Sequence, residues 1–165
     1  MRKNRAMVPS PTAVAVLALD GVVAFDLGTA PQVFNAARRA DKLPLYTVIV
    51  CGPGPVRSTA GFTVTPDHDL SALTTAHTVI VPGVGAGGPV TDGTLDADVR
   101  SALRAAADRG ARIVSICTGA SVLAAAGLLD GRPAATHWPG AVGLPGCIRT
   151  STGISTSCSW TTATC

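Results

Sequence analysis

Short runs of apolar residues alternate along this chain with stretches in which apolar residues recur at helical spacing. This alternation is typical of β–α–β units that assemble into a parallel sheet. The runs expected to form strands are Val14–Leu19, Tyr46–Val50, Phe62–Thr65 (a short strand or hairpin arm), Thr78–Val81, Arg112–Ile116 and a further one beginning at Ala134–Trp138. The expected helices are Leu27–Ala40, Leu95–Arg109 and Thr118–Ala126, with Pro31 tolerable only near the start of the first. The pattern therefore predicts an α/β fold.

The pattern changes abruptly after Trp138. The segment Pro139–Cys165 has no acidic residue, and ten of the last seventeen residues are Ser or Thr. We therefore expect a disordered leader at 1–12, one α/β domain at 13–138, and a tail at 139–165 that is a frame-shifted translation. A fold left incomplete at its C-terminus would expose an apolar face and an unpaired sheet edge.

Composition narrows the possible functions. Of the 165 residues, 47% are hydrophobic and 14% are charged, which suits one domain with a substantial core. All ten acidic residues are aspartates, so no glutamate of this chain can act as a general base or metal ligand. The net charge of +3 is not gathered into a basic stripe, so we expect no nucleic acid to be bound by this chain itself.

The cysteines and the start of the chain bear on cofactors and compartment. The five cysteines are irregularly spaced without a CxxC pair, which indicates neither a zinc site nor a disulfide framework, and we expect no cofactor.

The start of the chain superficially matches an export signal, with the basic segment Met1–Arg5 followed by the apolar segment Ala13–Leu19. However, Pro9 and Pro11 interrupt the connection between these two segments, and Asp20 ends the apolar run. No apolar stretch approaches membrane-spanning length. We expect a cytoplasmic protein without a membrane partner.

The strongest chemical signal is the segment Ile113–Ala120, in which an expected strand ends at Cys117 and a helix begins at once. A helix start favours the thiolate form of a cysteine, and its N–H groups can hold an oxyanion. The alternative is a cysteine that serves as a small buried hydrophobe. The Pro82–Gly85 stretch follows another expected strand, where a glycine would let a backbone N–H approach a bound oxygen. Its alternative is a plain loop, and no Gly-Lys-Ser/Thr follows to make it a phosphate loop.

Polar residues elsewhere could complete a site around Cys117. Asp26 follows the first expected strand and would face the same crevice, although an Asp there can simply cap a helix. His137 could flank the crevice, whereas His68 and His77 lie in polar connections and are expected to face solvent. A complete Cys–His–acid triad cannot be assembled from the sequence.

The segments VLALDGVVAFDLGTAPQVF, TVIVPG and RIVSICTGASVLAAAGLLDGRPAATHW together resemble the PfpI/ThiJ superfamily, which is type 1 glutamine amidotransferase-like. More closely, they resemble the N-terminal domain of AraC-type bacterial transcriptional regulators. The resemblance runs from Val14 to Trp138 and implies a flavodoxin-like parallel-sheet sandwich and a homodimer. In those regulators the domain is thought to sense a small-molecule ligand and is followed by a helix-turn-helix domain, which we expect this chain to lack.

The same resemblance implies a second function. Isocyanide hydratases share the segment around Cys117. By that resemblance Cys117 is the nucleophile candidate and Asp26 the acid/base candidate. The backbone amides of Gly83 and Thr118 are the oxyanion-hole candidates. Gly119 and His137 complete the set of ligand-binding candidates. Superfamily proteases and deglycase-like members place a Glu near the cysteine and often a His directly after it. Here Asp26 and Thr118 stand in those places, which disfavours both activities. We expect a sensor without turnover; the alternatives are a cysteine-dependent hydratase and a structural remnant with neither activity.

Overall fold

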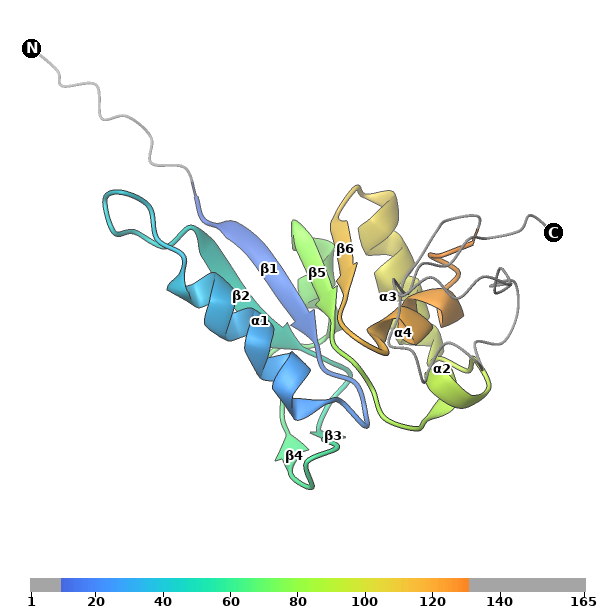
Figure 1. Ribbon diagram of the computed structural model, residues 1–165. Helices are drawn as coiled ribbons and strands as arrows, with labels where there is room; N and C mark the ends of the chain where they lie inside the picture. Colours follow the sequence, from blue (N-terminus) through green and yellow to red (C-terminus); the bar gives the residue numbers. More distant parts are fainter. Residues whose placement is uncertain (1–9, 131–165) are drawn as a thin grey trace, which may run out of the picture.

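The computed structural model describes residues 10–130, which form a parallel sheet covered by helices on both faces (Figure 1). The sheet consists of β1 (Thr12–Leu17), β2 (Tyr46–Cys51), β5 (Thr78–Val81) and β6 (Arg112–Ser115). Its strand order is β2-β1-β5-β6, and every neighbouring pair is parallel. A separate antiparallel hairpin pairs β3 (Val56–Arg57) with β4 (Thr63–Val64). The predicted α/β parallel-sheet fold is confirmed.

The alternation of side chains along β1 divides the core between the two faces of the sheet. Val14 and Val16 pack with residues of α1 (Ala24–Ala36), which lies in front of β1 and β2 in Figure 1. Ala15 and Leu17 point the other way, toward α3 (Ala97–Asp108), the 3₁₀ helix η1 (Leu70–Thr74) and α4 (Gly119–Ala125). One short helix, α2 (Gly88–Thr91), follows β5. No helix within residues 10–130 is long and apolar enough to cross a membrane.

The first helix differs from its prediction at both ends. It begins three residues early because the Val23 N–H bonds to Gly83 O at 2.8 Å, and the Leu27 N–H then closes the first turn on Val23 O. It ends early because Ala37 is extended. Pro31 therefore lies inside the helix rather than near its start, and the carbonyl of Leu27 loses its usual N–H donor.

The edge of the sheet formed by β6 is less buried than the central strand β5 beside it. Within the described residues β6 is an edge strand, and Val114 and Ile116, which pack with the α1-side cluster, are only partly buried. The strand expected at Ala134–Trp138 lies outside the described residues, as do the leader up to residue 9 and the whole tail.

The strand order also fixes where a ligand can bind. The chain passes from β1 to β2 on one side and reaches β5 and β6 on the other, so the order reverses between β1 and β5. In open α/β sheets the carboxyl ends of the strands at such a switch point form the usual binding crevice. The connections that follow β1, β5 and β6 all begin at this edge.

Candidate functional site

Cys117 lies on a strained turn between β6 and α4. Its φ is +53°, a value that residues with a side chain rarely adopt and that costs about 1–3 kcal/mol. The turn is closed by a bond from the Gly119 N–H to Ile116 O at 2.9 Å, which makes Cys117 the second residue of a four-residue turn. A positive φ there followed by a helical residue, Thr118, fits a type II′ turn. Because such strain persists only where the surroundings enforce it, and Cys117 is exposed, the elbow predicted from the sequence holds a thiol toward solvent.

Two glycines let the elbow approach β5 and the loop after it. A side chain on Gly119 would begin in contact with the backbone oxygens of Val81 and Pro82, which explains why α4 starts at a glycine. A side chain on Gly83 would begin 2.6 Å from Asp26 Oδ2, 3.1 Å from Thr118 Oγ1 and 3.2 Å from Cys117 Cβ. The three side chains therefore converge on one point above the Gly83 backbone, and the structure brings together the predicted residues Asp26, Gly83, Cys117 and Thr118.

Asp26 is a buried carboxylate of α1 rather than a surface cap. It is 8% exposed, and its Oδ2 accepts a hydrogen bond from the Gly83 N–H at 3.1 Å. Its place in the first turn of α1 also sets the negative charge against the positive end of the helix dipole. The Gly83 amide, predicted as an oxyanion donor, is therefore engaged by Asp26 in this structure.

The hydroxyl of Thr118 has a role that the sequence did not reveal. It accepts from the Val84 N–H at 2.9 Å and donates to the Val84 carbonyl at 2.7 Å. This double contact fastens the loop after β5 to the elbow after β6. The only signal in the sequence was a hydroxyl-bearing residue directly after the cysteine, which does not identify its partner.

The two histidines in the described part of the chain lie away from this cluster. His77 Nδ1 accepts from the Ala13 N–H at 3.2 Å, at the amino ends of the strands. The backbone of His68 forms an isolated parallel β-bridge with Cys51 at the end of β2. In the strand order, β2 lies three strand spacings, roughly 14 Å, from β6, which leads to Cys117. Both histidines are exposed, as predicted. His137 lies outside the described residues, and no metal-binding group of three or more His, Cys or acidic residues occurs within 10–130.

A buried carboxylate beside an exposed cysteine on a strained strand-to-helix turn defines a class of α/β domain with a cysteine-bearing elbow after one of its strands. Residues 12–162 match the DJ-1/PfpI family, and the chain belongs to that family. The matched region extends beyond Trp138 into the tail, for which the frame-shift remains a prediction.

Several relatives share this similarity. A Streptomyces lividans protein described as "Uncharacterized protein in cpoL 5'region" is 36% identical over 132 residues, which cover 80% of this chain and 92% of that protein. The HTH-type transcriptional regulator GlxA of Rhizobium meliloti is 37% identical over 118 residues, covering 70% of this chain and 36% of the regulator. Isonitrile hydratase of Pseudomonas putida is 34% identical over 84 residues, covering 51% of this chain and 36% of the enzyme.

The fold agrees with the same family. The crystal structure of a ThiJ/PfpI family protein from Pseudomonas syringae superposes with a TM-score of 0.56 at 28% identity, covering 74% of this chain and 48% of that one. The chain thus spans about a third of the regulator and of the hydratase, and about half of the solved protein.

Proposed function

We propose that this chain is a ligand-sensing domain related to those of HTH-type transcriptional regulators, and that it binds a small molecule without converting it. The similarity to GlxA over 70% of the chain supports the relation to regulators. Contact with DNA would belong to a different domain of such a regulator. The cytoplasm is the compartment in which we expect it to act.

The observation that carries the absence of turnover is the bond between the Gly83 amide and Asp26. An oxyanion formed by attack of Cys117 on a carbonyl would use that N–H as one of its two predicted donors, but the N–H donates to Asp26 Oδ2 at 3.1 Å. Stabilising the oxyanion would require breaking a hydrogen bond to a buried carboxylate, and a catalytic oxyanion hole is effective because its donors are already directed at the developing charge. For the same reason we expect no peptidase or glutaminase activity.

A second candidate function, hydration of an isocyanide, is favoured by the exposed Cys117 on its strained turn and by the adjacent Asp26. The Cys117 thiolate would attack the terminal isocyanide carbon, and Asp26 would transfer protons as water adds and the thiol leaves. The product would be an N-substituted formamide. The similarity to isonitrile hydratase over 51% of the chain supports this alternative.

One assay separates the two functions. The purified chain is incubated with cyclohexyl isocyanide, and formation of N-cyclohexylformamide is followed. We expect no rate above that of buffer. Turnover that persists in Cys51→Ala, a change at a buried thiol of another strand, but disappears in both Cys117→Ala and Asp26→Ala, would establish the hydratase and refute the sensor.

We also propose that the domain forms a homodimer through the outer side of α1. Phe25 is 81% exposed and Val33 is 62% exposed on this helix, and Phe62 of the hairpin connection is 53% exposed. Large apolar side chains at such exposure are suited to burial against a second subunit. Sedimentation should show a dimer that Phe25→Asp weakens, whereas Leu43→Asp, at an exposed residue outside α1, should leave it intact. A Phe25→Asp protein that sediments like the parent would refute this interface.

A further inference from the structure

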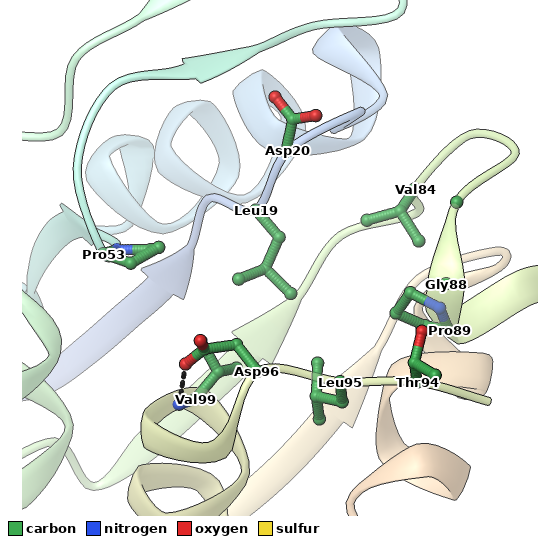
Figure 2. Close-up of a pocket in the computed structure, with 11 residues that line it drawn as sticks. Leu19, Asp20, Pro53, Val84, Gly88, Pro89, Thr94, Leu95, Asp96 and Val99 are labelled. Atoms are coloured by element: carbon green, nitrogen blue, oxygen red, sulfur yellow. Dashed lines mark hydrogen bonds between the residues drawn. The ribbon is translucent and has the colours of Figure 1, made fainter.

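A pocket of about 500 Å³ opens at the carboxyl edge of the sheet, beside the start of α3 (Figure 2). Its apolar walls come from Leu19 after β1, Val84 and Pro89 around the loop after β5, and Leu95 and Val99 at the start of α3. The pocket therefore lies at the switch point between β1 and β5, where ligands of open α/β sheets bind. Its volume lies within the range of small-molecule sites.

This pocket is separate from the cysteine cluster. None of Asp26, Gly83, Cys117 and Thr118 lines it. The two places share Val84, whose side chain forms part of the pocket wall while its backbone N–H and carbonyl hold Thr118 Oγ1. A molecule in the pocket would thus contact the loop that is fastened to the elbow.

We propose that the ligand sensed by this domain binds in this pocket rather than at Cys117, and that it is a small, largely apolar molecule that is neutral or cationic. The proposal rests on the sensor function proposed above. The apolar walls call for an apolar body in the ligand, and the described lining contains no lysine or arginine that could pair with an anion.

The charged residues of the lining argue against an anionic ligand. Asp96 Oδ1 accepts from the Asp98 N–H at 2.9 Å and the Val99 N–H at 3.1 Å, so the N–H groups at the start of α3 that would attract an anion are already occupied by a carboxylate. Asp20 Oδ1 is held by the Arg57 N–H at 2.9 Å. Both carboxylates are exposed, and because Asp20 points away from the apolar walls in Figure 2, Asp96 is the charge that bears on a bound ligand. One opposite charge at about 4 Å in water changes affinity about five-fold.

The test uses three probes of similar shape and different charge: benzylamine, benzyl alcohol and benzoate. Amide resonances of the full chain labelled with ¹⁵N are followed during titration with each probe. We expect shifts at Gly87, Gly88 and Leu95 with benzylamine and benzyl alcohol, and binding of benzoate at least about five-fold weaker than that of benzylamine. Val84 is common to both places and does not discriminate between them.

Variants then assign the binding to the pocket. Leu95→Trp should fill the cavity and abolish the shifts, whereas Ala105→Trp, at an exposed position of α3, should preserve them. The double variant Asp20→Asn with Asp96→Asn keeps an oxygen acceptor at both positions, and Asn caps a helix as well as Asp does. It should therefore fold and should remove the preference for benzylamine over benzoate.

Three results would overturn the pocket as the ligand site: shifts confined to Asp26, Gly83 and Cys117; undiminished binding in Leu95→Trp; or no shifts with any probe at millimolar concentration. Benzoate binding as tightly as benzylamine would overturn the ligand class. These failures are distinct from failure of the sensor function, which is refuted by isocyanide turnover that depends on Cys117 and Asp26.

Discussion

Gly83→Ala is the substitution for which the structure predicts the sharpest local effect. The new methyl group would lie 2.6 Å from Asp26 Oδ2, closer than carbon and oxygen can approach without a bond. Either the carboxylate or the loop must move, and because Asp26 is 92% buried there is little space into which it can turn. The 3.1 Å bond from the Gly83 N–H is then lost, and a hydrogen bond to a charged group contributes about 1.5–3 kcal/mol.

Equilibrium unfolding in urea measures this effect. Gly83→Ala should lower the free energy of unfolding by about 1.5–3 kcal/mol, with the melting temperature falling by about 2–4 °C for each kcal/mol in a chain of this length. Gly28→Ala is the matched control, because its nearest neighbour would be Gln32 Nε2 at 3.9 Å and because a glycine inside α1 weakens the helix. That control should raise stability by about 0.5–1 kcal/mol. If Gly83→Ala is no less stable than the parent protein, Asp26, Thr118 and Cys117 do not converge on this backbone.

Three further predictions concern buried and exposed polar groups. Iodoacetamide at neutral pH should modify exposed Cys117 before buried Cys51, as peptide mass spectrometry can show; faster labelling of Cys51 would refute the elbow. Burial, and to a lesser degree the charge of Asp69, raises the pKa of the Cys51 thiol from 9.0 to about 11. The contribution of the neutral thiol to the free energy of unfolding is therefore complete below pH 9 and is lost as the pH rises through about 11. Stability should fall by roughly 2–3 kcal/mol more over that interval in the parent than in Cys51→Ala, and equal slopes would contradict the assignment. Ser121→Ala should raise the free energy of unfolding by about 1 kcal/mol, because the Ser121 hydroxyl is 1% exposed and has no hydrogen-bond partner among the described residues; a decrease would show that it has one.

The sequence predicted the parts of the site that depend on strand order and spacing. Thr78–Val81 was predicted to the residue, and a parallel sheet necessarily brings the ends of β1, β5 and β6 to one edge, so Asp26, Gly83 and Cys117 could be grouped in advance. The start of α1 could not be predicted, because it is set by a hydrogen bond from Val23 to Gly83, 60 residues away in the chain.

Side-chain contacts between distant loops were also beyond the sequence. Two such contacts are the hydrogen bonds of Thr118 with the Val84 backbone and of Asp26 with the Gly83 N–H. They form only if separate loops are placed relative to each other to within tenths of an ångström. The apolar pocket was missed because its lining comes from four separate segments, which follow β1, β2 (Pro53) and β5 and lead into α3, and none of them carries a recognisable motif. Residues such as Leu19 and Val99 look like ordinary core positions when read along the chain.

A sensor that binds its ligand without converting it should release that ligand unchanged, and this can be measured by recovering the bound molecule. Small molecules that raise the melting temperature of the chain are identified, incubated with the protein for many hours, and recovered for mass spectrometry. We expect at least one neutral or cationic apolar compound that stabilises the protein and is recovered chemically unchanged. Conversion of the stabilising compound by the parent protein, abolished in both Cys117→Ala and Asp26→Ala, would contradict this expectation.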